Sequence, residues 1–200
     1  MPRNDKILCA AAAAAAISAF IAPDMAAAQV APQIVGFTYA GNGCPRGSAR
    51  SVYDAVNHRL TVNFDEFATE TPPGESKACN VNFVVRLPSP MQISLTRVEY
   101  LGYADTGPNV SGQIRRRYKY GTLRPYTQVT NLARGLQDSF HVVDSFPGWS
   151  VCANQVTVAT TTRIDLHGTT LPNETNEMVV DATQYEGTGV VYTFSYRPCR

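Results

Sequence analysis

From residue 33 to the end of the chain, apolar side chains recur at every second position in short segments. Leu60, Val62 and Phe64, for example, alternate with Thr61 and Asn63. A period of two is typical of antiparallel strands with one buried face, and no segment keeps the 3.6-residue period that indicates a helix. The chain is therefore expected to be all-β. The same alternation returns in residues 80–87, 113–120, 156–166 and 190–196.

Turn-forming residues separate these segments. The stretches 54–57, 88–90 and 106–109 are rich in Pro, Gly, Asn and Asp, which favour turns and interrupt strands. Eight or nine strands at this spacing predict a single antiparallel β-sandwich, with a β-barrel as the alternative. The longest loops are expected at residues 67–77 and 168–177, within that one domain.

The first 28 residues have the pattern of a signal peptide. Arg3 and Lys6 precede an alanine-rich apolar segment, and Ala26 to Ala28 supply the small residues that a signal peptidase reads. The apolar segment is too short and too weakly apolar to span about 30 Å of hydrocarbon. We therefore expect cleavage after Ala28, a domain at 29–200, and a secreted or periplasmic protein with no stable membrane anchor.

Four cysteines follow the leader: Cys44, Cys79, Cys152 and Cys199. An even number in an oxidising compartment indicates two disulfides, with three connectivities. We favour Cys44–Cys79 and Cys152–Cys199, because each bond would join residues of one half of the chain and the second would fix the C-terminus. A zinc site is disfavoured, since no two cysteines have the Cys-x-x-Cys spacing of zinc ligands.

Two short motifs carry a resemblance. Gly43-Cys44-Pro45-x-Gly47-Ser48 follows the first expected strand, and Trp149-Ser150-x-Cys152 precedes a late one. With Cys79 and the terminal cysteine, this order is similar to a family of small secreted proteins known as a domain of unknown function. The resemblance runs from Ile34 to Cys199. It implies secretion and a shared β architecture, and it brings no activity and no catalytic residues.

The basic run at 115–120 is the most distinctive local feature. Strand alternation places Arg115, Arg117 and Lys119 on one face and Tyr118 and Tyr120 on the other. The cationic stripe would suit an acidic or sulfated polysaccharide, and the two tyrosines would offer an aromatic platform for sugar rings. The structural alternative is a charged edge strand that prevents aggregation.

Other chemistries have weaker support. The net charge of +1 gives no field that attracts nucleic acid. His141 has Asp144 and Ser139 nearby, but a strand would turn Asp144 to the opposite face from the other two. No cofactor motif is present, although loop oxygens would suit calcium. The calcium candidates are Glu70, Glu75, Asn173, Glu174 and Glu177, and the carboxylates considered for glycoside hydrolysis are Asp65, Glu66, Glu99, Asp165, Asp181 and Glu186.

These observations predict a monomeric, non-enzymatic extracellular binding or structural module that acts on polysaccharide or on a protein surface. The first alternative is an extracellular hydrolase whose acidic residues assemble in a cleft, and a weaker one is a secreted inhibitor or effector that acts through the 67–77 loop. Asn109 and Asn173 lie in glycosylation sequons, which matter only in a host with that machinery.

Overall fold

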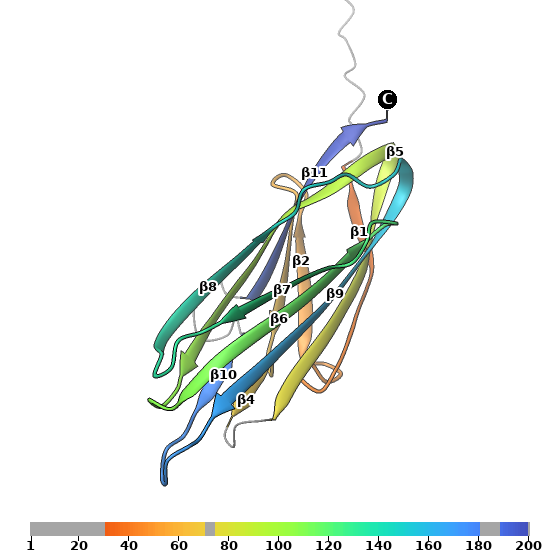
Figure 1. Ribbon diagram of the computed structural model, residues 1–200. Coiled ribbons are helices and arrows are strands. Elements are labelled where there is room, and N and C mark those ends of the chain that lie inside the picture. Colours follow the sequence, from red (N-terminus) through yellow and green to blue (C-terminus); the bar gives the residue numbers. More distant parts are fainter. Residues whose placement is uncertain (1–30, 71–74, 181–188, 200) are drawn as a thin grey trace, which may run out of the picture.

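The computed structural model describes residues 31–70, 75–180 and 189–199, and every regular element in these ranges is a strand (Figure 1). The leader and its cleavage site lie outside the described residues. The strands are β1 (Gln33–Ala40), β2 (Ala49–Asp54), β3 (Arg59–Phe64), β4 (Ala68–Glu70), β5 (Ser76–Asp105), β6 (Val110–Tyr120), β7 (Tyr126–Asn131), β8 (Gln137–Ser145), β9 (Ala153–Gly168), β10 (Glu177–Val179) and β11 (Gly189–Pro198). No helix in the described ranges is long and apolar enough to cross a membrane.

Strand β5 determines the architecture, because it takes part in both layers of the fold. Its first part, Ser76–Arg86, pairs with β1 and β9, and its second part, Met91–Asp105, pairs with β11 and β8. The β9 register is interrupted between Arg86 and Met91, where the chain contains two prolines that have no N–H for a ladder. Residues 88–90 were expected to be a turn between strands and are instead a bend within one strand.

The bend folds the sheet into two facing layers. One layer contains β1, the first part of β5, β9, β6 and β7, and the other contains β2, β3, β11, the second part of β5 and β8. Among the described strands β2 and β7 end the hydrogen-bonded path without pairing with each other, so the sheet is open and the barrel alternative is wrong. The all-β antiparallel prediction is confirmed. The three-residue strands β4 and β10 lie within or beside the segments expected to be loops.

Side chains from both layers fill the space between them. The Phe83 ring of β5 packs edge-on against Tyr192 of β11, with 5.3 Å between ring centroids, and Phe194 lies 6.0 Å away. Leu60, Val98 and Ile164 are fully buried in the same core. The alternating strands therefore bury one face each, as their period of two predicts.

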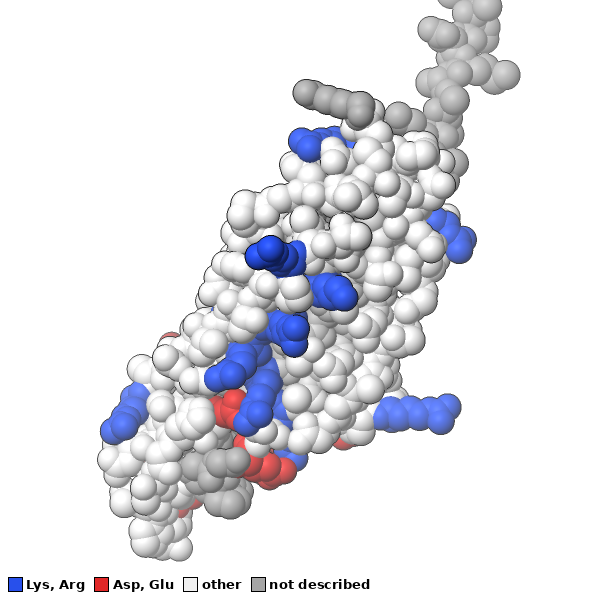
Figure 2. All heavy atoms as spheres, turned by 45° about the vertical axis from the view of Figure 1, so that its right-hand side comes forward, with Lys and Arg blue, Asp and Glu red and all other residues white. Residues whose placement is uncertain are grey.

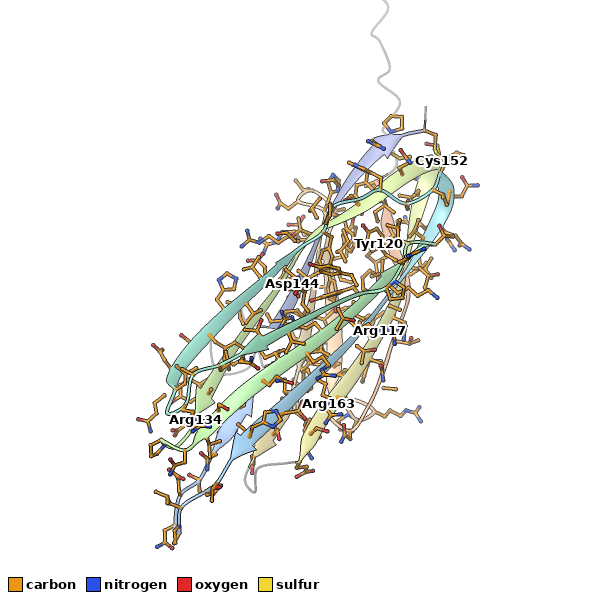
Figure 3. All side chains as sticks on the ribbon, viewed as in Figure 1. Arg117, Tyr120, Arg134, Asp144, Cys152 and Arg163 are labelled. Atoms are coloured by element: carbon orange, nitrogen blue, oxygen red, sulfur yellow. A yellow bond between two sulfur atoms is a disulfide. The ribbon has the colours of Figure 1, made fainter. Side chains whose placement is uncertain are left out.

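The two predicted disulfides are confirmed. Cys44 bonds to Cys79 with 5.4 Å between Cα atoms, and Cys152 bonds to Cys199 with 5.8 Å. The first bond fixes the segment between β1 and β2 to β5. The second joins the start of β9 to the end of β11, and so links the two layers at the end where Figure 3 labels Cys152.

Candidate functional site

Strand β6 has one face in the core and one in solvent. Arg115, Arg117 and Lys119 are exposed, as the alternation predicted. Tyr118 and Tyr120 point into the core, where they retain only 1% and 6% of their exposure. The predicted aromatic platform is therefore wrong for these two tyrosines, because their rings are needed to fill the space between the layers.

The buried face of β6 carries a charged network that joins the two layers. Arg116 Nε and Nη2 donate to the two carboxylate oxygens of Asp144 on β8, at 2.8 and 2.9 Å, and Nη1 donates to the Ile114 carbonyl at 2.8 Å. The Tyr118 hydroxyl also donates to Asp144, and it lies 3.1 Å from the Tyr100 hydroxyl. Burial raises the pKa of Tyr100 to about 12. This network holds β6 firmly against the opposite layer.

The solvent face of β6 continues across β9 and β5 as a set of rows. Because the three strands are in antiparallel register, each outward residue of β9 lies between one residue of β6 and one of β5. The rows are Lys119–Ala159–Asn82, Arg117–Thr161–Asn80 and Arg115–Arg163–Ala78. We call this surface the basic face.

The cations of the basic face are poorly balanced by acids. Among the described residues, no carboxylate lies within 4.0 Å of the charged nitrogens of Arg115, Arg117 or Lys119. Arg163 pairs with Asp165, and its Nε lies 3.0 and 3.1 Å from the two carboxylate oxygens. Figure 2 shows Lys and Arg side chains in a column down this side of the molecule, with Asp and Glu side chains near its lower end.

A hollow of about 290 Å³ opens in the basic face. Ala159 has a small side chain and lies between Asn82 and Lys119, so the hollow lies over the first row. Thr161 Oγ1 donates to Asn80 Oδ1 at 2.7 Å, whereas no described residue hydrogen-bonds the side chain of Asn82. The complete lining is Asn80, Asn82, Arg117, Lys119, Pro125, Ala159, Thr160 and Thr161.

A second hollow, of about 370 Å³, lies at the end of the molecule near β4 and β10. Glu70, Asp105, Glu174 and Glu177 line it. Burial raises the pKa of Glu177, and the neighbouring charges of Glu70 and Asp105 raise it further. Within the described ranges, no three His, Cys, Asp or Glu side chains are placed so that they could hold a metal ion. Three of the acids considered for calcium, Glu70, Glu174 and Glu177, therefore share this hollow.

One protein family matches almost the whole described chain. The model of the family described as "Domain of unknown function (DUF4360)" matches residues 31–199. The chain belongs to this family. A DUF4360 assignment confirms the resemblance carried by the cysteine and Trp-Ser motifs.

A curated relative of this DUF4360 chain is an uncharacterized secreted protein from Arthroderma benhamiae, 29% identical over 129 residues. The match covers 60% of this chain and 53% of the relative, so the chain spans about half of the relative's length. The two disulfides of this chain are typical of proteins that fold outside the cytoplasm.

Two solved structures show a looser likeness. One is TmCBM61 in complex with β-1,4-galactotriose, at a TM-score of 0.35 and 10% identity, covering 82% of this chain and 90% of that one. The other is the enzymatically active domain of the bacteriophage CBA120 tailspike protein 4, at a TM-score of 0.24 and 10% identity, covering 80% of this chain and 19% of that one. Both TM-scores are below 0.5, and the galactotriose ligand and the enzymatic activity belong to those two proteins.

The Ser-His-Asp candidate on β8 does not assemble. His141 lies on the exposed face of β8, where its Nε2 is 3.0 Å from Glu99 Oε1, while Asp144 points into the core. Asp65 pairs with Arg50 at 2.8 Å, and Asp165 is held by Arg163. Asp181 and Glu186 lie outside the described residues. Ser139, His141 and Asp144 of the DUF4360 domain therefore do not form a triad.

Sequence reasoning missed the contributions of β5 and β9 to the basic face. Asn80, Asn82 and Ala159 come next to Arg117 and Lys119 only through pairing across three strands. Their alternation with apolar residues does indicate that they point outward, but not which strand lies beside which. Asp105 was likewise missed in the acidic hollow, because it ends β5 and is distant in sequence from the other acids.

Proposed function

We propose that this DUF4360 protein is a non-enzymatic extracellular binding module that holds an anionic polysaccharide on its basic face. The observation that carries the proposal is the set of Arg115, Arg117 and Lys119, exposed on one strand without acidic partners among the described residues. The net charge of the chain is only +1, so this concentration of cations is local. A polyanion would supply the missing counter-charges.

The arrangement is costly for a protein that has no ligand for it. Arg115 lies directly opposite Arg163 on β9, and like charges in directly opposed positions destabilise a sheet, although the contact of Arg163 with Asp165 offsets part of this repulsion. An edge strand with alternating charges of both signs would prevent aggregation without this cost. Strand β6 pairs with β9 on one side and with β7 on the other, so it is not an edge strand, and the alternative of a charged edge strand is wrong.

The support beneath the face favours recognition. Arg116 and Tyr118 alternate with the exposed cations and are fixed by Asp144 on the other layer. Backbone positions that are fixed before binding lose less conformational entropy when the ligand arrives. The outward cations are therefore presented at a nearly constant spacing along β6.

The proposal includes export of the protein from the cytoplasm. Cleavage after Ala28 would release a chain of Gln29–Arg200 into the periplasm or the medium, where the two disulfides form. A monomer would leave the basic face free for a polymer. Mass spectrometry of the mature protein would identify its first residue.

The experiment is a binding titration of oxidised Gln29–Arg200 with dextran sulfate, polygalacturonate and neutral dextran, at low and high salt. We expect binding to the two acidic polymers, weakening with salt because exposed charges are screened. Arg115→Gln/Arg117→Gln should weaken binding about tenfold or more, since each lost charge-assisted hydrogen bond is worth about 1.5–3 kcal/mol. The matched control is Arg134→Gln, an exposed arginine that Figure 3 places apart from Arg117 and Arg163.

Two results would overturn the proposal. Binding to no acidic polymer, or equal weakening by Arg134→Gln and by the double variant, would remove the basic face as the site. Release of reducing ends from a bound polymer, abolished by Glu177→Gln, would show a hydrolase acting at the acidic hollow and would overturn the non-enzymatic part.

A further inference from the structure

The hollow beside Arg117 and Lys119 has a chemistry that charge alone does not require. Its lining combines two cations with the amides of Asn80 and Asn82 and the hydroxyl of Thr161. An amide has both donors and an acceptor, which match the hydroxyl groups of a sugar. A site for a bare polyanion needs only the cations.

The shape of the hollow follows from one residue. Ala159 lies on the outward face of β9, directly between Asn82 of β5 and Lys119 of β6. A larger side chain at this position would fill the space between the two flanking strands. The volume of about 290 Å³ is near the lower end of the range of about 300–1,000 Å³ that small-molecule sites occupy. It therefore suits a single small ring better than a long segment of polymer.

The lining also limits how a ring could be held. It includes no aromatic side chain, so a sugar here would not be stacked on a ring. Hydrogen bonds and charge remain as the sources of affinity. The Asn82 amide has no hydrogen-bond partner among the described residues and is free to bind a hydroxyl group.

We infer that the hollow over Ala159 is a subsite for one acidic sugar unit. Its carboxylate or sulfate group is bound by Lys119 and Arg117, and its ring hydroxyls are bound by Asn82 and by the Asn80–Thr161 pair. This inference rests on the proposed function, and it adds that the protein distinguishes an acidic sugar from other polyanions. The outer cations, Arg115 among them, contribute charge without this selectivity.

The test compares polymers that share charge and differ in their rings. Dextran sulfate and polygalacturonate carry sulfate and carboxylate groups on hydroxylated rings, and polyphosphate carries charge alone. The variant is Ala159→Leu, which fills the hollow and keeps every cation. Its matched control is Thr157→Leu, on the same outward face of β9 and outside the lining. Circular dichroism and the melting temperature establish that each variant is folded.

We expect Ala159→Leu to weaken binding of at least one acidic polysaccharide tenfold or more and to change polyphosphate binding less than twofold. Asn82→Ala should weaken the same polysaccharide about fivefold, as the loss of one hydrogen bond predicts. The polymer that responds identifies the group as carboxylate or sulfate. Thr157→Leu should leave all three affinities unchanged.

The outcomes that overturn the inference differ from those that overturn the proposed function. If Ala159→Leu affects polysaccharide and polyphosphate equally, or affects neither, the subsite is wrong while binding by the basic face stands. If the unmodified protein binds polyphosphate and no acidic polysaccharide, the subsite and the polysaccharide ligand are both wrong, and only the binding of polyanions by the basic face stands. If it binds none of the three polymers, both conclusions fail.

Discussion

Replacing Asp144 by Asn should be among the most destabilising conservative substitutions in this protein. The Asp144 side chain is 4% exposed and that of its partner Arg116 is 2% exposed. The substitution preserves shape but leaves the guanidinium buried without a counter-charge. Breaking a buried ion pair by removing one partner costs about 3–5 kcal/mol. For a domain of this size such a loss lowers the melting temperature by roughly 6–20 °C.

The exposed pair between Arg50 and Asp65 provides a matched control. Its nitrogen–oxygen distance is the same 2.8 Å, but the two side chains are 66% and 34% exposed. Asp65→Asn should therefore cost about 0–1 kcal/mol, the range for ion pairs in water. Because the two ion pairs have the same nitrogen–oxygen distance and differ in burial, the difference between their costs measures the effect of burial.

Urea denaturation gives the free energy of unfolding of each variant. The values are comparable where the dependence of that free energy on urea concentration is the same in both variants. The double variant Arg116→Met/Asp144→Leu should be less destabilised than Asp144→Asn, because no charge is left unpaired in the core. A cost below about 1 kcal/mol for Asp144→Asn would refute the reasoning. So would equal costs for Asp144→Asn and Asp65→Asn.

Three further predictions use the same measurements. Burial raises the pKa of Tyr100 to about 12 and also raises that of Tyr118, so the native state keeps protons that the unfolded chain releases near pH 10. The contribution of each such tyrosine to the free energy of unfolding should be constant below pH 10 and should fall by about 1.4 kcal/mol per pH unit between pH 10 and 12. Tyrosinate absorbance should rise as the protein unfolds. Cys44→Ser/Cys79→Ser should lose about 4 kcal/mol by the chain-entropy relation for a separation of 35 residues. Arg115→Gln without ligand should raise the free energy of unfolding by about 0.2–1 kcal/mol, and a decrease would contradict the repulsion inferred on the basic face.

The sequence was sufficient for the local periods and the cysteine pairing. The alternation in β6 correctly predicted that Arg115 and Arg117 lie on the opposite face from Tyr118, because successive side chains of a strand point to opposite faces. It did not say which face is buried, since both faces carry arginine and Arg116 lies on the same face as Tyr118 and Tyr120. That choice depends on Asp144, which neutralises Arg116 inside the core from another strand.

Long-range pairing limited the rest of the prediction. The two prolines at residues 88 and 90 resemble a turn, yet β5 continues past them because each of its parts pairs with different partners. The hollow required the same kind of information. Asn82, Ala159 and Lys119 are separated in sequence and become neighbours only through register, which no local pattern specifies.

Register links the stability of β6 to its proposed role. A shift of one residue would turn every side chain of a strand to the opposite face. In β6 it would turn Arg115, Arg117 and Lys119 inward, where Asp144 could balance one of these three charges, and would expose Tyr118 and Tyr120. The observed register buries one arginine, Arg116, against one acid, Asp144, so these two buried charges balance, whereas the shifted register would leave buried cations without an acid. The buried ion pair thus stabilises the register that places three cations in solvent, and this explains how one strand serves both the core and the basic face.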